Sequence, residues 1–367
     1  MNKLRLNKLQ EQLTSHRLNG VALVPGPNML YISDIHCHLS ERPIVLFIPA
    51  KGEPAIIIPT LEAMKAQNAG ISDDHIFDWN DQEGYAAAFQ GASKRLALKG
   101  WAVGVEALHM RVLELDLLQQ FAPGITFSHA EPIISQLRSV KDETEITAME
   151  KAILVAEKSM HLLLPRINIG MSEKQIAAML TQTLLEEGAE SIAFGPIVAS
   201  GPNSASPHAV PTNRSIQPGD LLVIDWGVYV DGYPSDITRT FAVGEIDGEL
   251  RAIYEIVSAA NARGKEVAKP GVRGQDVDRA ARQVIQDAGY GANFFHRTGH
   301  GLGLEVHEEP NMVEGNLEPL RPGNVFTVEP GIYLAGYGGV RIEDNVLITA
   351  DGSRSLTSFP RELITVG

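Results

Sequence analysis

Cysteine is nearly absent from this chain of 367 residues, because Cys37 is the only one. A single cysteine excludes an internal disulfide and leaves no zinc-finger spacing, which favours a reducing compartment. Long apolar runs are missing too, since no window reaches the roughly 18 apolar residues of a membrane-spanning helix. The amino-terminal segment MNKLRLNKLQEQLTSHRL carries charged or amide side chains throughout and holds no signal-peptide core. We therefore expect a cytoplasmic protein with no membrane partner.

Basic clusters are also missing. The 45 acidic residues outnumber the 31 lysines and arginines, which leaves a formal net charge of -14. Such a charge repels phosphate backbones, and no run of basic residues marks a nucleic-acid site. The apolar share of 44% and the charged share of 21% are ordinary for a soluble globular protein. We expect no DNA or RNA partner.

The length of the chain predicts two domains, because single cores stop growing near about 250 to 300 residues. The first part alternates helical patterns with apolar strand patterns such as GVALV, RPIVLFIP and PAIIIP. This alternation predicts a mixed α/β domain over residues 1–135, with helices packed on a sheet. Beyond it, Ser139 and Asp142 have the spacing of a capping box that would open a long helix over Glu143–Leu164. Residues 136–367 then form the second domain.

The second domain contains an internal repeat. The segment PGDLLVIDWGVYVDGY from Pro218 aligns without a gap with PGNVFTVEPGIYLAGY from Pro322, with six identities in sixteen positions. The helical segments that precede the two copies correspond as well. Two copies of helices followed by a hairpin predict a pseudo-twofold arrangement. An acid occupies the same strand position in each copy, Asp225 in the first and Glu329 in the second.

The first copy carries a second acid that can face the first one. Asp231-Gly232 is a strong signal for a two-residue hairpin turn, which would set Asp225 opposite Thr238. Asp236 would then lie one diagonal step away on the same face of the sheet. The two carboxylates can therefore converge.

The second copy has its own pair of acids, Glu329 and Glu343. A five-residue, glycine-rich loop over Ala335–Gly339 would place Glu343 diagonal to Glu329 on one face. Four carboxylates that converge from two hairpins would repel one another strongly unless cations neutralise them. Each acid taken alone is more often an ordinary hydrogen-bonded or solvent-facing side chain, so the metal hypothesis depends on the set.

A nitrogen ligand is available in the glycine-rich segment FFHRTGHGLGLEVHEEP. The glycines beside His300 would let the backbone approach an ion closely. Imidazole together with carboxylates suits Mn, Fe, Co or Zn better than Ca. A dinucleotide-binding loop is the weaker interpretation, because the full glycine spacing and a downstream acid are not evident. A lone histidine in such a loop is more often structural, so only the whole set supports His300 as a ligand.

These motifs together resemble one family. The ligand order is similar to that of the pita-bread metallopeptidases, the group of methionine aminopeptidase, aminopeptidase P, prolidase and creatinase. The segments SPHAVPTNR, VFTVEPGIY and GGVRIEDNV carry the same resemblance, and LRSVKDETEI resembles the domain junction of the prolidase, aminopeptidase P and creatinase branch. The resemblance covers nearly the whole chain. It implies an amino-terminal creatinase/prolidase-like domain followed by a catalytic pita-bread domain.

The resemblance implies a metal-dependent peptidase with a dinuclear site. Asp225 would bind one divalent ion and His300 the other, while Asp236 and Glu343 would bridge the two. Glu329 would bind one ion and act as general base toward the attacking water. Manganese is the expected metal, with Co, Zn and Fe as alternatives.

Further side chains acquire roles by the same resemblance. His208 and His307 would donate hydrogen bonds to the scissile carbonyl or the oxyanion, although a solvent-exposed loop histidine is the alternative for His208. His296 would support the site from behind its ligands. Arg341 lies on the same strand face as Glu343 and could hold a ligand carboxylate, with an outward salt bridge as the alternative.

The branch that the chain resembles cleaves the bond before proline, whose tertiary amide lacks an N–H. A dipeptidase must also recognise a free carboxylate, which requires a cation. Some prolidases have an arginine shortly after the HExP segment, where this chain has Asn311. Arg42, in YISDIHCHLSERP, is our hypothesis for the substitute, and a surface arginine is the alternative.

An Xaa-Pro dipeptidase is the favoured function. Aminopeptidase P, which acts on longer peptides, is the alternative, and a metal-free pita-bread module that binds peptides or proteins is the third interpretation. The expected partners are small proline-containing peptides, and the resemblance implies a homodimer.

Overall fold

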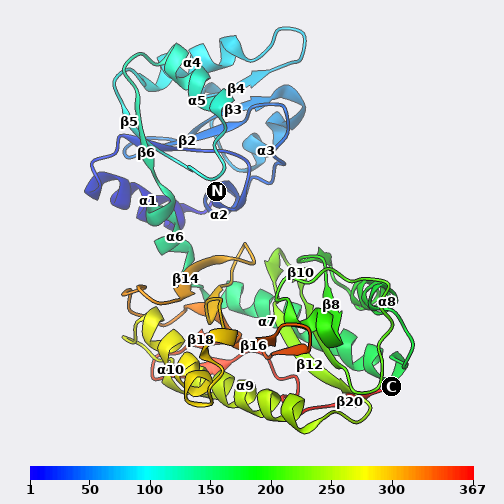
Figure 1. The fold of residues 1–367 in the computed structure, drawn as a ribbon. Coiled ribbons are helices and arrows are strands. Elements are labelled where there is room, and N and C mark those ends of the chain that lie inside the picture. Colours follow the sequence, from blue (N-terminus) through cyan, green and yellow to red (C-terminus); the bar gives the residue numbers. More distant parts are fainter. The chain divides into compact units, whose positions relative to one another are not determined.

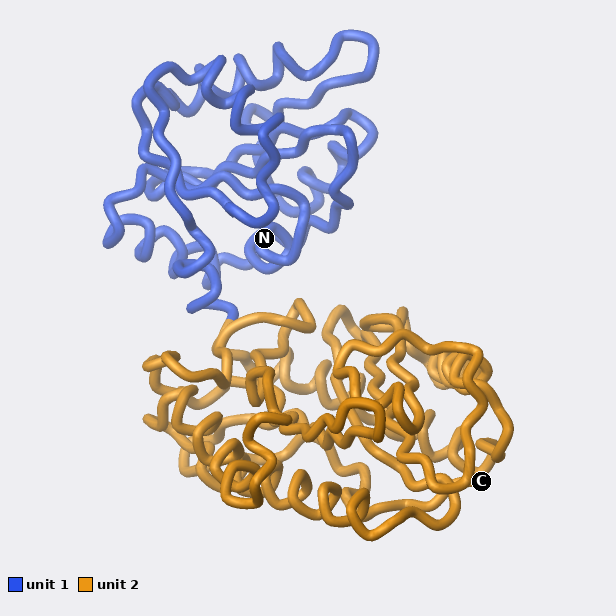
Figure 2. The backbone as a smooth tube through the Cα atoms, viewed as in Figure 1, with its two compact units in different colours: residues 1–138 blue, residues 139–367 orange.

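The computed structural model describes residues 1–367. The chain folds into two compact units, residues 1–138 and residues 139–367, which Figure 2 draws in different colours. None of the helices combines the length and the apolar character that crossing a membrane requires.

The first unit is built on a six-stranded mixed sheet, ordered β4-β3-β2-β1-β5-β6. β2 pairs antiparallel with β1 and β3, and the remaining neighbours pair in parallel. The strands are β1 (Gly20–Leu23), β2 (Val45–Pro49), β3 (Ala55–Pro59), β4 (Ile76–Trp79), β5 (Ala102–Val105) and β6 (Thr126–His129). The helices are α1 (Lys3–Ser15), α2 (Pro27–Ser33), α3 (Ala63–Asn68), α4 (Ala86–Leu96), α5 (Val112–Phe121) and α6 (Glu131–Arg138).

The core of this unit explains its strand sequences. β2 and β3 are buried along their whole length, so they appear in the sequence as continuous apolar runs. Phe89 of α4 and Leu118 of α5 pack with Phe47 of β2 in one apolar cluster. The predicted mixed α/β character of the first part of the chain is confirmed.

The second unit has two helix pairs, one for each copy of the repeat. The helices are α7 (Glu143–Leu163), α8 (Glu173–Glu186), α9 (Gly248–Val267) and α10 (Gly274–Asp287). The long helix expected after the junction is therefore confirmed, but its predicted cap is wrong. The capping box is formed by Asp142 with Glu145, because Asp142 accepts from the backbone N–H of Glu145 and the Glu145 carboxylate accepts from that of Asp142.

The sheets of the second unit follow the same duplication (Figure 1). The first copy forms the small sheet β11-β10-β7 and the strands β12-β9-β8 of a four-stranded sheet, whose outer strand β20 comes from the end of the chain. The second copy forms β14-β13-β15-β18-β19 and β16-β17. The first-copy strands are β7 (Ser191–Ile192), β8 (Ile197–Ser200), β9 (Leu221–Trp226), β10 (Val228–Val230), β11 (Tyr233–Pro234) and β12 (Ile237–Val243). The others are β13 (Gly299–Gly301), β14 (Glu308–Met312), β15 (Val325–Val328), β16 (Gly331–Leu334), β17 (Gly338–Arg341), β18 (Asp344–Ile348), β19 (Ser353–Ser355) and β20 (Thr365–Val366). Five short 3-10 helices complete the chain: η1 (Thr60–Glu62), η2 (Asp73–His75), η3 (Leu164–Arg166), η4 (Gly201–Ala205) and η5 (Gly291–Asn293).

The first hairpin has the predicted register. Asp231 and Gly232 both have positive φ, at 51° and 75°, as a tight two-residue turn requires. Thr238 pairs with Asp225 across β9 and β12. The prediction for this hairpin is confirmed.

The second hairpin differs from its prediction. Leu334 pairs with Gly338 and Tyr333 with Gly339, so the loop contains three residues instead of five. Gly338 and Gly339 belong to β17, where a Cβ on Gly339 would lie 2.2 Å from the carbonyl oxygen of Ser204. Gly339 therefore allows the close approach of η4, and neither glycine forms the turn. The shorter loop keeps the face of each strand, and it puts Glu343 directly opposite Glu329 instead of diagonal to it.

Candidate metal centre

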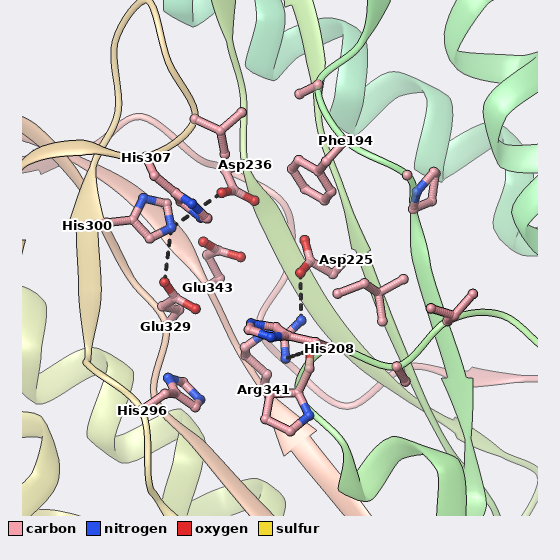
Figure 3. Close-up of a pocket in the computed structure, with 18 of the residues that line it drawn as sticks. Phe194, His208, Asp225, Asp236, His296, His300, His307, Glu329, Arg341 and Glu343 are labelled. Carbon is pink, nitrogen blue, oxygen red and sulfur yellow. Dashed lines mark hydrogen bonds and ion pairs between the residues drawn. The ribbon is translucent and has the colours of Figure 1, made fainter. Parts of the chain in front are cut away.

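Four acids from the two hairpins meet between the two halves of the second unit (Figure 3). Asp225 lies on β9, and Asp236 directly precedes β12. Glu329 follows β15, and Glu343 sits between β17 and β18. The hydroxyl of Thr238 on β12 donates to Oε2 of Glu343 at 2.6 Å, and the N–H of Glu343 donates to the Thr238 carbonyl at 3.1 Å. Hydrogen bonds between the copies thus fix the relative position of their acids.

His300 approaches this group from β13. Its Nε2 lies 3.2 Å from Oε1 of Glu329 and 3.6 Å from Oδ2 of Asp236. Glycine on both sides is a steric requirement, because a Cβ at Gly299 would lie 1.8 Å from the Thr327 carbonyl oxygen, and one at Gly301 would lie 2.3 Å from that of Glu309. The close packing of β13 between β14 and β15 therefore puts the imidazole among the acids.

The five predicted ligands have the chemistry and spacing of a cation site. Their ligand atoms form overlapping groups whose members all lie within 4.8 Å of one another. The groups are Asp225, Asp236 and Glu343; His300, Glu329 and Glu343; and Asp236, His300 and His307. Oδ1 of Asp225 is buried and has no hydrogen-bond partner. A bound cation would coordinate this oxygen. One imidazole and four carboxylates suit a divalent ion such as Mn, Fe, Co or Zn.

The pKa values of the acids also support a cation site. Burial, followed by the charges of neighbouring carboxylates, raises the pKa of Asp236 and of Glu343 well above their usual values. Burial also raises the pKa of Asp225 despite the charge of Arg341. Burial alone would raise the pKa of Glu329 too, but its hydrogen bond with His300 and the nearby positive charges hold it at about 2. Without cations the site therefore retains protons that bound cations would displace.

Arg341 is an internal partner of the site. Its Nη2 donates to Oδ2 of Asp225 at 2.6 Å, and its Nε donates to the Thr238 hydroxyl at 3.1 Å. Burial works against its charge, but the Tyr333 hydroxyl and the nearby carboxylates outweigh burial and raise the pKa of Arg341 well above its usual value. Of the two interpretations of Arg341 in the sequence, the structure favours the inward one.

His296 lies behind the ligands, in contact with Tyr333. Its Nε2 is 2.9 Å from the Tyr333 hydroxyl, and its Nδ1 is 2.7 Å from the carbonyl oxygen of Arg297. Burial lowers the pKa of His296, so the ring is neutral at pH 7. Arg341 also donates to the Tyr333 hydroxyl at 3.1 Å, so one tyrosine connects the histidine and the arginine that the sequence singled out separately.

The acids and histidines line a cavity of about 910 Å³. His208 and His307 both lie on its wall and reach solvent. The ring of His307 packs edge-on against His300 with centroids 4.2 Å apart, and burial of part of the ring, with the charge of His300, lowers the pKa of His307 to about 4. Apolar side chains form much of the remaining wall and include Phe194, Val210 and Val306.

Arg42 lies in the first unit, apart from this group in the chain. Its guanidinium makes two hydrogen bonds to Asp81, at 3.0 and 2.8 Å, and one of 2.8 Å to Glu41. Its role in substrate recognition stays a prediction.

Three side chains of the site escaped sequence reasoning. Tyr333 lies in the second hairpin of the repeat and Phe194 lies in a loop that matches no motif. Arg297 belongs to the glycine-rich segment that contains His300. Only Arg297 carried a usable signal, because it is a basic residue three positions before the predicted ligand.

Comparison with known proteins assigns the chain to a family. Residues 147–350 match metallopeptidase family M24, and residues 5–140 match the creatinase/prolidase N-terminal domain. An Xaa-Pro dipeptidase of Pyrococcus horikoshii is 36% identical over 362 residues, which cover 98% of each chain. The crystal structure of a recombinant prolidase from Thermococcus sibiricus superposes with a TM-score of 0.94 at 36% identity and covers 100% of both chains. An X-Pro aminopeptidase from Thermotoga maritima superposes with a TM-score of 0.82 at 32% identity, covering 96% of this chain and 99% of its own. The chain therefore belongs to metallopeptidase family M24 and is a metal-dependent peptidase with a pita-bread domain and a creatinase/prolidase-type amino-terminal domain.

Proposed function

We propose that this protein is an Xaa-Pro dipeptidase, which hydrolyses the peptide bond before a carboxyl-terminal proline. One observation carries the proposal: five ligand-type side chains and two further histidines line a single cavity in a chain that belongs to the M24 family. The relatives named above as Xaa-Pro dipeptidase and prolidase support the substrate class. Catalysis would belong to the second domain, residues 136–367, and residues 1–135 would form the first.

The proposed cofactor is a pair of divalent ions, with manganese favoured over Co, Zn and Fe. Asp225, Asp236, His300, Glu329 and Glu343 would hold them. When bound, such ions supply Lewis acidity that activates a water molecule and polarises the substrate carbonyl. Arg341 would keep the Asp225 carboxylate in its ligating orientation through their 2.6 Å ion pair.

Glu329 is the proposed general base. Its pKa of about 2 keeps the carboxylate ionised at neutral pH, so the group can accept the proton of the attacking water. The hydroxyl of Thr327 donates to Oε1 of Glu329 at 3.1 Å, which orients the carboxylate. Glu329 would then pass the proton to the leaving proline nitrogen, because that nitrogen must be protonated to depart.

His208 and His307 are the proposed donors to the substrate carbonyl. With a pKa of about 4, His307 is neutral at pH 7 and can donate through one ring N–H while its charge stays at zero. Donors that face a developing oxyanion contribute about 3 kcal/mol each to transition-state stabilisation. The apolar wall around Phe194 and Val306 would exclude bulk water and accept the proline ring.

Aminopeptidase P activity is the second candidate. The resemblance to the Thermotoga maritima X-Pro aminopeptidase and the presence of Asn311, where some prolidases have arginine, favour it. A metal-free binding module is a weaker third candidate, because no ligand type is replaced. A small proline-containing peptide is the proposed partner in either enzymatic case, within a cytoplasmic homodimer.

Rates on Ala-Pro and on Ala-Pro-Ala, measured after metal analysis and with added Mn²⁺ or Co²⁺, distinguish these candidates. We expect about two bound ions per chain and a higher kcat/KM on the dipeptide. Faster cleavage of the tripeptide would assign the chain to aminopeptidase P. Absence of bound metal and of both activities after reconstitution would leave the binding module.

A further inference from the structure

Arg297 is a cation of the cavity wall that no acid neutralises. The cavity is lined by two arginines, Arg297 and Arg341. Arg341 is paired with Asp225 at 2.6 Å, whereas Arg297 makes no ion pair. Its Nη1 donates to Oδ1 of Asn311 at 2.6 Å, which is a neutral amide. A half-buried guanidinium with unused donors in a substrate cavity favours an anionic group of the ligand.

Asn311 is held in place for this contact. Its Nδ2 donates to Oε1 of Glu309 at 2.8 Å, and its backbone N–H donates to Oε2 of the same residue at 2.9 Å. These bonds turn the amide oxygen of Asn311 toward Arg297. The strand register brings the two residues together, because the N–H of Thr298 donates to the Met312 carbonyl at 3.0 Å.

The same pair explains the departure at position 311. An arginine here would place its own charge near the cavity, but this chain has an asparagine that orients a guanidinium from the neighbouring strand. A guanidinium is therefore still present at the cavity, but Arg297 supplies it instead of residue 311. Arg297 and His307 line the same cavity. Arg297 thus shares the cavity wall with the proposed carbonyl donor.

We propose that Arg297 binds the free α-carboxylate of an Xaa-Pro dipeptide and that Asn311 positions it. This inference rests on the proposed function and adds the origin of its dipeptide selectivity. In Xaa-Pro the carboxylate belongs to the same proline whose nitrogen leaves, so it enters the same cavity as the scissile bond, where Arg297 can pair with it. A longer peptide or an amide has an uncharged group at that position and gains no ion pair.

The test compares Ala-Pro with the uncharged Ala-prolinamide in the Mn²⁺-loaded protein. The measured quantity is the ratio of the kcat/KM values for the two substrates. Arg297→Met should lower this ratio about tenfold or more, chiefly by raising KM for Ala-Pro, because a charge-assisted bond is lost. Arg297→Lys should restore part of the ratio. Asn311→Asp should lower it while Arg297 is still present, since the new carboxylate would neutralise the guanidinium.

Two controls separate recognition from folding. Arg279→Met removes an exposed arginine that pairs with Glu314 outside the cavity and should leave the ratio unchanged. Proline binding, measured by calorimetry, should weaken about tenfold in Arg297→Met, and its thermal unfolding should stay close to that of the unmodified protein.

An unchanged ratio in Arg297→Met, with both substrates still cleaved, would overturn the assignment of Arg297 and leave the proposed function intact. If Arg42→Ala lowered the ratio instead, the carboxylate would be recognised from the first domain. If the unmodified protein cleaved neither substrate after metal loading, the proposed function and this inference would both fail.

Discussion

At the scale of single residues, Glu329 differs from the other acids of the centre in its charge state. Its pKa is held at about 2, whereas burial and like charges raise the pKa values of Asp236 and Glu343. The acid that stays ionised is also the one hydrogen-bonded to His300 and to Thr327. These features support the proposed role of Glu329 as the proton acceptor.

Glu329→Gln should lower kcat on Xaa-Pro substrates by about 10²-fold or more, because an amide cannot accept the proton. Steady-state kinetics at saturating Mn²⁺, together with metal analysis of the purified variant, would measure this. Glu314→Gln, an exposed acid outside the cavity, is the control. A metal-loaded Glu329→Gln with nearly full kcat would exclude this proton acceptor.

Arg341→Met should destabilise the metal-free protein by about 3 to 5 kcal/mol, because it leaves the buried carboxylate of Asp225 without its partner. Urea unfolding of both proteins in a chelator would give the difference in free energy. Arg279→Met breaks an exposed pair and should change stability by no more than about 1 kcal/mol. Equal effects of the two substitutions would mean that Arg341 does not stabilise the buried acid.

Part of the residue-scale grouping could be predicted from spacing, and the roles of the side chains came from the family resemblance. Asp225 and Glu329 recur at one strand position of the repeat, and His300 sits in a segment whose glycines prove to be steric requirements. The contacts of Tyr333 and Arg297 could not be predicted, because they depend on how β13, β14 and β16 lie beside one another. Local sequence carries no information on those distances.

At the scale of elements, the two hairpins show when the register of a strand pair can be predicted from the sequence of its turn. The first is set by Asp231-Gly232, whose backbone angles suit one turn type. In the second, the three glycines of AGYGG are compatible with several loop lengths. The interpretation of Gly338 and Gly339 as loop residues is wrong, because both belong to β17, where Gly339 allows the close contact with η4. A glycine therefore marks a turn only where no other backbone comes close.

Glu173, at the start of α8, joins that helix to the first-copy sheet. It accepts hydrogen bonds from the backbone and hydroxyl groups of Ser200 and Thr212 and from Asn203. Burial alone would raise the pKa of Glu173, but these donors outweigh it and hold the pKa below its usual value. A lowered pKa stabilises the fold above the pKa of the unfolded chain, and this contribution is lost as the pH falls through the folded value.

Glu173→Gln should lower the free energy of unfolding by about 1 to 3 kcal/mol at pH 7, because the amide group presents a donor to other donors. The difference from the unmodified protein should shrink as the pH falls below about 4. Denaturant titrations at several pH values would follow both effects. Glu186→Gln, at the exposed end of the same helix, is the matched control, and an equal loss in both variants would contradict this role.

At the scale of the whole molecule, length and pattern predicted two domains that meet at residue 135 and an internal repeat in the second. The chain divides into two compact units at residue 138. The strands of both predicted hairpins appear among the four sheets of the second unit, and its long helix ends within one residue of the predicted end. The sequence did not predict α2, β4, α4, β6 and α6 of the first unit. β4 and β6 are only partly buried and lack a clear apolar pattern. The apolar pattern of these segments was too weak to predict a helix or a strand.

Removal of the metal should lower the melting temperature of the whole chain, since the acids of both halves then repel one another. Binding at about 100 times Kd contributes roughly 2.7 kcal/mol, which corresponds to a shift of about 5 to 10 °C for a domain of this size. Calorimetry before and after dialysis against a chelator, and again after Mn²⁺ is restored, would measure it. Asp236→Asn should show little of this shift. An unchanged melting temperature in chelator would mean that metal binding does not stabilise the fold.

The cross-copy bonds of Thr238 with Glu343, and of Arg341 with Asp225, have a consequence for biogenesis. The proposed ligands come from both copies of the repeat, so an ion that needs all of them would be captured only after the last strands have been synthesised and docked. Metal uptake would then depend on a finished polypeptide. Nascent or truncated chains would neither sequester scarce ions nor expose a premature hydrolytic activity to the peptides around them.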